Sequence, residues 1–173
     1  RGGRVAALLG DRYLWTGESR ARPMREWRLM SELRAEGLPV PAPVAARYVR
    51  EGLFYRGDLI TERIIDALPL SGWLDRGGVA LTHWRAVGAC IRHFHERGVC
   101  HADLNAHNIL LDKAGAVSLI DFDRGTRREP GEWQQQTLAR LRRSLVKIGK
   151  ALPRGRFGEP EWHALSQGYA SGG

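Results

Sequence analysis

The sequence contains little cysteine, little lysine and no long apolar run. Only two of its 173 residues are cysteine, Cys90 and Cys100, which excludes a framework of several disulfides and is typical of a reducing compartment. No uncharged stretch reaches the roughly 18–20 residues of a transmembrane helix, and no signal-peptide pattern opens the sequence. Lysine occurs three times against 24 arginines, and never before Lys113. We therefore expect neither a disulfide-stapled secreted domain nor a membrane-spanning helix.

The apolar and charged content fits one globular domain. Apolar residues make up 43% and charged residues 27%, mixed along the whole length, which excludes global disorder. A domain of this size buries enough apolar surface to fold without a structural metal. The net charge of +8 indicates an anionic partner, and nucleic acid, a phosphorylated metabolite and an acidic membrane surface are the candidates. Genomic base composition explains the excess of arginine over lysine equally well.

Turn residues divide the first part of the sequence into a helix and a hairpin. Residues 23–36 carry helical spacing, with a proline in the first turn and a glycine after the last. Three alternating prolines then force an extended backbone over residues 37–43. Two strand-like runs, 44–49 and 53–64, are joined by an Arg-Glu-Gly turn and predict a β-hairpin.

The second part is mostly helical. Residues 82–97 form the clearest helix, because their apolar residues recur every three or four positions, and Thr82 is its expected cap. The other expected elements are a short helix near 70–75, a small hairpin of 109–111 and 117–120, and helices over 133–152 and 161–169. This order predicts an α+β fold with a small mixed part, 1–65, and a helical part, 66–173.

Polar residues that can bind a metal ion or accept a proton are predicted to gather around the small hairpin. Asp103 and Asn108 end a tight polar loop, 99–108, and Asp121 follows the returning strand of the hairpin that starts after Asn108. Antiparallel pairing therefore brings Asp121 back beside Asn108. An amide and a carboxylate with room for waters and phosphate oxygens are a usual Mg²⁺ site. The second carboxylate, Asp103, can orient a hydroxyl and accept its proton.

The same residues match the catalytic pattern of the protein-kinase-like fold, which is His-x-Asp-x-x-x-x-Asn followed by Asp-Phe. His101, Asp103, Asn108 and Asp121 agree with it in type, order and spacing. We expect His101 to orient the loop by hydrogen bonding. Glu26 shares an otherwise apolar helical stripe, so it needs a cationic partner, and in this fold such a glutamate pairs with the phosphate-anchoring lysine.

Several departures point away from protein kinases. Ala102 replaces the arginine that clamps a phosphorylated activation loop, Asn105 stands where protein kinases carry lysine, and Asp123 stands where they carry glycine. No Ala-Pro-Glu segment occurs among the 52 residues after Asp121. A small-molecule or glycolipid acceptor is therefore more plausible than a peptide.

Five stretches together resemble the bacterial 3-deoxy-D-manno-octulosonic acid (Kdo) kinases, which are relatives of the lipopolysaccharide heptose kinases. These stretches are Tyr-Leu-Trp-Thr-Gly at 13–17, Arg-Glu-Trp-Arg at 25–28, Gly-Leu-Pro-Val-Pro at 37–41, His-Ala-Asp-Leu-Asn-Ala-His-Asn at 101–108 and Asp-Phe-Asp-Arg-Gly at 121–125. Such enzymes use ATP and Mg²⁺ to phosphorylate the 4-hydroxyl of Kdo on lipid A, at the cytoplasmic face of the bacterial inner membrane. The resemblance implies a two-lobe kinase-like fold, with residues 1–65 as a partial N-terminal lobe and residues 66–173 as the C-terminal lobe.

The resemblance also implies residue roles. Asp103 would be the catalytic base, Asn108 and Asp121 of the 121–125 segment would hold the metal, and Glu26 would serve the nucleotide site. The glycine-rich strand pair and the phosphate-anchoring basic residue of the family precede its Arg-Gly-Gly segment, at which this sequence begins, and no Gly-x-Gly-x-x-Gly occurs here. We expect that start of the N-terminal lobe to be absent from this chain.

The basic residues suggest how an acidic acceptor is held. Arg124, Arg127 and Arg128 follow the metal aspartate and are the candidates for contact with the sugar acid, because the arginine fork suits carboxylate and phosphate. The helix over 133–152 has leucines on one face and basic residues on the rest, so it either packs on the domain or also meets anionic lipid. Peripheral contact with an anionic membrane is expected.

Three alternatives remain beside this hypothesis. A heptose or aminoglycoside phosphotransferase has a similar catalytic loop. A non-catalytic nucleic-acid-binding module fits the charge, but no helix-turn-helix, RNA-recognition or zinc-finger signature occurs, so no nucleic acid is expected. A zinc site among the histidines near the loop lacks the usual ligand spacing.

Overall fold

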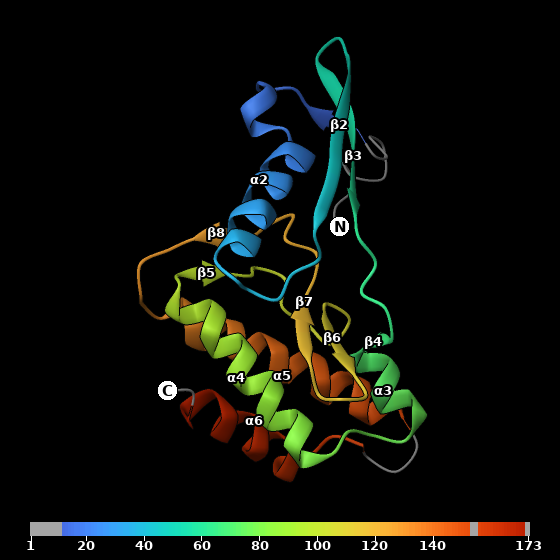
Figure 1. The fold of residues 1–173 in the computed structure, drawn as a ribbon, viewed down its shortest axis with the longest axis vertical. Coiled ribbons are helices and arrows are strands. Elements are labelled where there is room, and N and C mark those ends of the chain that lie inside the picture. The colour runs from blue at the N-terminus through green and yellow to red at the C-terminus, as the bar shows by residue number, and fades with distance from the viewer. Residues whose placement is uncertain (1–11, 153–155, 172–173) are drawn as a thin grey trace.

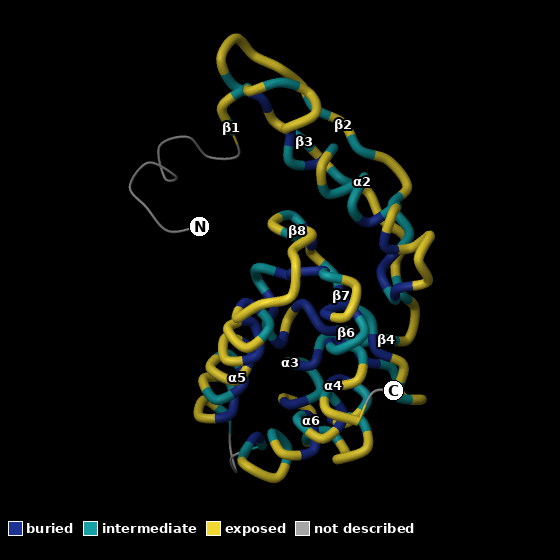
Figure 2. The backbone as a smooth tube through the Cα atoms, turned by 90° about the vertical axis from the view of Figure 1, so that its left-hand side faces the viewer, coloured by how far each residue is buried: buried dark blue, intermediate teal, exposed yellow. Residues whose placement is uncertain are grey.

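The computed structural model describes residues 12–152 and 156–171, and it has an α+β architecture, as predicted. Figure 1 shows a long β-hairpin and helix α2 (Arg22–Ala35) at one end, and the remaining labelled helices with short strands at the other. In Figure 2 much of the buried backbone lies around the strands β6 (Ile109–Asp112) and β7 (Val117–Leu119) and in the helices next to them. The boundary between two lobes near residue 66 stays a prediction.

The first sheet has the order β1-β3-β2 and confirms the predicted hairpin. Strand β2 (Pro43–Glu51) pairs with β3 (Phe54–Thr61), and the two-residue strand β1 (Tyr13–Leu14) adds to the free edge of β3. The expected extension of the second strand to residue 64 is wrong. Thr61 already pairs with Pro43, the first residue of β2, so no partner strand remains beyond it.

Helix α2 (Arg22–Ala35) packs beside this hairpin, as Figure 1 shows, and confirms the predicted helix over 23–36. Its buried residues are Pro23, Met30 and Leu33. The first turn approaches β3 closely, because a Cβ on Gly57 would lie 2.5 Å from Cγ of Pro23. A glycine in the strand therefore fixes where α2 begins.

The second sheet has the order β4-β6-β7. Strands β6 (Ile109–Asp112) and β7 (Val117–Leu119) form the predicted small hairpin, with Ile109 opposite Leu119. Strand β4 (Ala67–Pro69) was not expected, because three residues ending in proline carry no strand periodicity. The pair of β5 (Val99–Cys100) with β8 (Thr126–Arg127) is equally short and was also missed.

The helices α3 (Leu70–Arg76), α4 (Leu81–Glu96), α5 (Trp133–Ala151) and α6 (Glu159–Ser171) agree closely with the predicted ones. The expected capping by Thr82 is wrong. Helix α4 already begins at Leu81, its N-cap is Ala80, and no side chain caps it, so Thr82 lies within the first turn. Within the described residues, no helix combines the length and apolar content required to span a membrane.

Helices α4 and α6 cross with their backbones in contact, and a glycine on each side allows it. A Cβ on Gly88 would lie 2.0 Å from the carbonyl oxygen of Leu165, and a Cβ on Gly168 would lie 2.0 Å from that of Arg85. Both positions are buried. The crossing anchors α4, whose C-terminal end leads directly into the polar loop at 101–108.

Replacing Gly88 with alanine is expected to lower the free energy of unfolding by about 3 kcal/mol, since the added carbon forces the two helices apart. Gly72→Ala is the matched control, because Gly72 lies in α3 with nothing within 4 Å of an added Cβ. Better helix propensity there is expected to raise stability by about 0.5–1 kcal/mol. Urea unfolding of both variants measures the difference, and a Gly88→Ala protein as stable as the wild type contradicts the close crossing.

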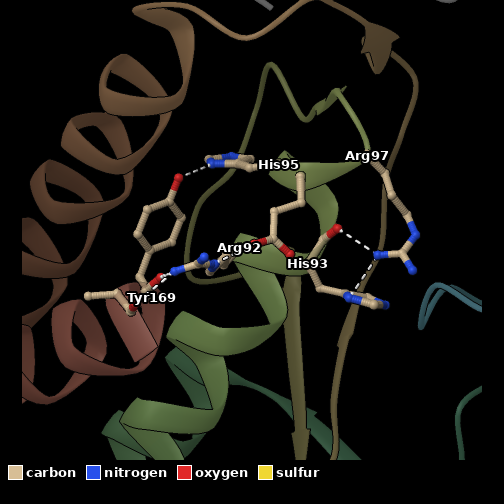
Figure 3. A network of polar contacts seen from close by, with 7 residues as sticks. Arg92, His93, His95, Arg97 and Tyr169 are labelled. Carbon is tan, nitrogen blue, oxygen red and sulfur yellow. Dashed lines mark hydrogen bonds and ion pairs between the residues drawn. The ribbon is translucent and has the colours of Figure 1, made fainter. Parts of the chain in front are cut away.

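A polar network at the C-terminal half of α4 ties it to the end of α6 (Figure 3). Arg92 Nη1 donates to the carbonyl oxygens of Tyr169 and Ala170, at 3.2 and 2.7 Å. The buried His95 ring forms a 2.9 Å hydrogen bond between its Nδ1 and the Tyr169 hydroxyl. Burial lowers the pKa of His95 to about 4 from an ordinary 6.5, so the ring is neutral at pH 7.

Acid is expected to destabilise the protein through His95. Because the folded-state pKa of His95 lies below the unfolded one, the unfolded state binds the extra proton, and stability falls as pH drops from about 6.5 toward 4. The stability difference between wild type and His95→Gln is therefore expected to shift by about 2 kcal/mol against the wild type between pH 7 and pH 5. Chemical unfolding at both pH values measures it, and a difference that stays constant refutes the neutral buried ring.

Candidate functional site

The polar loop between β5 and β6 holds Asp103 and Asn108 in a fixed arrangement. The side-chain amides of Asn105 and Asn108 both donate to the carbonyl oxygen of Asp103, at 2.8 and 3.1 Å. Asn105 also accepts a 2.8 Å hydrogen bond from the backbone N–H of His107. Asn108 is 8% exposed, and its amide nitrogen is used within the loop. The Oδ1 atom of Asn108 therefore remains available to a ligand.

His101 links this loop to the segment that carries Asp121. Its Nε2 donates to the carbonyl oxygen of Ile120 at 2.9 Å, and its ring lies 4.7 Å from that of Phe122, measured between centroids. Burial lowers the pKa of His101, and the negative charges of Asp121 and Asp103 act in the opposite direction. The contact with Ile120 places the buried imidazole directly before Asp121 in the chain. The role of His101 in orienting the loop stays a prediction, and these contacts are the ones that it would use.

The hairpin register brings Asp121 back to the loop. The backbone N–H of Ile120 donates to the carbonyl oxygen of Asn108 at 3.0 Å, one residue beyond the β6–β7 pairing. Asp121 follows with a φ of 66°, a left-handed conformation that few non-glycine residues adopt. Its side chain is exposed. The turn thus ends the strand and directs the chain at Asp121 out of the hairpin.

Glu26 reaches the same place from α2. Burial, and after it the nearby charge of Asp121, raise the pKa of Glu26 to about 7 from an ordinary 4.5. A hydrogen bond from the backbone N–H of Phe122 and the charge of Arg22 work in the opposite direction. Among the described residues no ion pair involves Glu26. The repulsion between the carboxylates of Glu26 and Asp121 would be relieved by a cation bound beside them.

An ion pair that sequence reasoning missed joins α2 to the 121–125 segment. Arg22 Nε donates to Asp123 Oδ1 at 2.6 Å, and a second guanidinium nitrogen contacts the other carboxylate oxygen. Gly125 lets the helix come close, because a Cβ there would lie 2.7 Å from Cδ2 of Leu29. Asp123 stood out in the sequence only as a departure from glycine. Its role is to hold α2, and hence Glu26, against Asp121.

A cavity of about 450 Å³ opens beside Glu26 and Asp121. Its walls come from α2, β3, the connector after β3, β6 and the residue before Asp121. The lining residues are Glu26, Met30, Pro41, Leu59, Thr61, Glu62, Arg63, Ile64, Ala67, Leu110, Ile120 and Asp121. Sequence reasoning found the two carboxylates but not the apolar walls, since no local pattern marks residues so far apart in the chain.

The three arginines expected to meet the acceptor lie in different surroundings. Arg127 pairs with Glu36 and also donates to the carbonyl oxygen of Arg97 at 3.0 Å. Arg128 Nε donates to Thr126 Oγ1 at 3.3 Å, and Arg124 is exposed with no polar contact to the described residues. The charge of Arg127 is thus already neutralised by a carboxylate.

The donor set at this site fits Mg²⁺. That ion prefers oxygen ligands and usually keeps several waters, with one or two carboxylates and substrate phosphates completing its shell. Asp121 supplies an exposed carboxylate, and Asn108 supplies a free amide oxygen. In the part of the chain that the structure describes, no three His, Cys, Asp or Glu side chains cluster as ligands of one metal ion. Asp121 and Asn108 could therefore hold a Mg²⁺ ion together with the phosphate oxygens that it carries.

Comparison with known proteins agrees with this geometry. The profile of the lipopolysaccharide kinase (Kdo/WaaP) family matches residues 1–169. A protein of Xylella fastidiosa strain 9a5c, named 3-deoxy-D-manno-octulosonic acid kinase, is 52% identical over 149 residues, which cover 86% of this chain and 59% of that protein. A protein of the same name from Xanthomonas axonopodis pv. citri is 49% identical over the same shares. The chain thus spans about three fifths of the length of these relatives.

Proposed function

Because the chain belongs to the lipopolysaccharide kinase (Kdo/WaaP) family, we propose that it transfers the γ-phosphoryl group of ATP to the 4-hydroxyl of Kdo on Kdo-lipid A. The observation that carries this proposal is the set of hydrogen bonds that joins the loop of Asp103 and Asn108 to the segment before Asp121. Asn108 donates to the carbonyl oxygen of Asp103, and Ile120 is bonded both to Asn108 and to the buried His101. The names of the relatives supply the acceptor, and the kinase-like loop supplies the reaction class.

In the proposed mechanism Asp103 is the general base. It takes the proton of the acceptor hydroxyl while the hydroxyl oxygen bonds to the γ-phosphorus, and the bond from that phosphorus to the β–γ bridging oxygen breaks, so that ADP leaves. Asn108 and Asp121 would hold Mg²⁺, which would supply positive charge to neutralise the phosphate oxygens. His101 donates to the carbonyl oxygen of Ile120, directly before Asp121, and so fixes the position of Asp121 relative to the loop that carries Asp103.

The nucleotide is proposed to lie in the cavity beside Glu26. The volume of about 450 Å³ is in the range of ligand pockets. Apolar side chains such as Met30, Leu59 and Leu110 suit a purine ring, while the Asp121 end suits metal-bound phosphates. Arg63 lines the same cavity and is exposed, so it is free to meet phosphate or ribose oxygens.

We further propose that the protein works peripherally at the cytoplasmic face of the inner membrane. Lys147 and Lys150 on α5 are exposed and make no polar contact within the described part of the chain. The half-buried Val146 lies directly before Lys147 and one turn before Lys150. Such a surface attracts anionic lipid headgroups, with about 1 kcal/mol per basic residue.

The proposal is tested with the full-length protein and labelled ATP. Kdo-lipid A is offered beside the same lipid lacking Kdo, a heptose-bearing core and an aminoglycoside. Transfer that requires Kdo supports the proposal. Transfer to the heptose or the aminoglycoside but not to Kdo identifies another acceptor class and refutes it, and the absence of any transfer refutes the kinase assignment for this chain.

A further inference from the structure

Arg140 forms an ion pair with the proposed catalytic base, a contact that the sequence did not predict. One of its guanidinium nitrogens, Nη2, donates to Asp103 Oδ1. Arg140 lies on α5, 37 positions from Asp103 in the sequence. Both side chains remain half exposed, at 49% for Arg140 and 41% for Asp103. The pair is therefore open to an incoming molecule.

Helix α5 borders the loop on a different side from the nucleotide cavity. Its Ser144 hydroxyl lies 3.5 Å from the backbone nitrogen of Ala106 in the loop, one turn after Arg140. No residue of α5 lines the cavity that contains Glu26 and Asp121. Since the hydroxyl that is phosphorylated must approach Asp103 from the side away from ADP, α5 borders the acceptor's side of the base.

The guanidinium of Arg140 has donors to spare. Among the described residues its one polar partner is Asp103, which it contacts through Nη2 alone. The group carries five N–H donors in a planar fork, so Nε and Nη1 can bind a second carboxylate while Nη2 keeps the first. Arg127, an expected acceptor residue, is paired with Glu36. Arg140 is thus the better placed cation for an anion beside Asp103.

We propose that Arg140 is the acceptor anchor, binding the carboxylate of the sugar acid and so placing the acceptor's hydroxyl at Asp103. This inference rests on the proposed function and names what recognises its substrate. Arg140 bridges two carboxylates, that of Asp103 and that of the acceptor, and each is a partner its fork can hold. A neutral sugar leaves these donors unpaired and binds more weakly.

The test compares a charged acceptor with a neutral one in the full-length protein. Kdo-lipid A in detergent is assayed beside its Kdo carboxyl methyl ester, with Arg140→Ala, Arg140→Lys and Arg143→Ala variants. Arg143 is the matched control, since it is exposed on the same helix and makes no polar contact with the described residues. Thermal unfolding checks that each variant folds. If Arg140→Ala does not fold, Arg140→Lys still tests the inference.

Arg140→Ala is expected to raise the KM for the acid acceptor about 30- to 150-fold, with the KM for ATP unchanged. The acceptor KM of Arg140→Lys is expected to lie between those of the wild type and Arg140→Ala. In the wild type, the KM for the methyl ester is expected to exceed that for the acid by a similar factor. In Arg140→Ala, the KM values for ester and acid are expected to be nearly equal. Arg143→Ala is expected to behave as wild type.

Three results overturn the inference while leaving the kinase intact. These are equal use of acid and ester by the wild type, a fall in kcat without a rise in acceptor KM in Arg140→Ala, and an equal loss in Arg143→Ala. No transfer by the wild type refutes the proposed function instead, and the inference with it.

Discussion

The Asp103→Asn variant of the full-length protein is expected to lose phosphoryl transfer by a factor of about 10³, within the range for removal of a general base. The amide keeps the shape of the side chain but cannot take the proton of the hydroxyl. The backbone carbonyl of Asp103, which accepts from Asn105 and Asn108, is untouched, so the loop is expected to keep its structure. The measurement is kcat with saturating ATP and acceptor.

Asp75→Asn is the control for that variant. Asp75 is an exposed carboxylate on α3, away from the loop, and its replacement removes the same charge. Its kcat is expected to stay within about twofold of the wild type. An Asp103→Asn protein that folds and retains most of its activity would show that another group takes the proton.

The Asp121→Asn variant is expected to lose both transfer and metal-dependent nucleotide binding. The Asp121 carboxylate is the charged oxygen ligand that the site offers beside the neutral Asn108. Its replacement by an amide is therefore expected to weaken MgATP binding by a factor of about 10–100. Calorimetric titration with ATP, with and without Mg²⁺, measures this. The kcat is expected to fall about 10³-fold, which is the size of the loss when one group that stabilises transition-state charge is removed.

The two aspartate variants are controls for each other. Asp103→Asn is expected to bind MgATP as the wild type does, because the base lies outside the nucleotide cavity. Asp121→Asn is expected to bind ATP without Mg²⁺ no worse than the wild type, since it removes a negative charge. If Mg²⁺ strengthens ATP binding equally in the wild type and Asp121→Asn, Asp121 does not hold the metal.

The elements with strong local signals could be predicted from the sequence. The helices and both hairpins have clear periodicity and turn residues, and the register of β6 and β7 sufficed to bring Asp121 back to Asn108. Strands of two or three residues, such as β5 and β8, have no such signal, because two residues cannot show alternation. Thr82 was misassigned because a cap residue and a first-turn residue look alike in sequence.

The parts of the site that sequence reasoning missed depend on long-range packing. Arg140 was seen as one of several basic residues on a helix, and only the fold shows that it contacts Asp103. The same holds for the pair of Arg22 with Asp123, which are 101 positions apart. Charge and spacing within one segment can propose ligands for a metal, but they do not tell which distant arginine neutralises which carboxylate.

The most direct test of the account is the identity of the product. The full-length protein is incubated with ATP, Mg²⁺ and Kdo-lipid A, and the product is examined by phosphorus and proton nuclear magnetic resonance. The account predicts a new phosphomonoester whose phosphorus couples to the proton at carbon 4 of Kdo, formed together with an equal amount of ADP. ADP formed without phosphorylated Kdo, or a phosphate on the lipid A sugars alone, would contradict it.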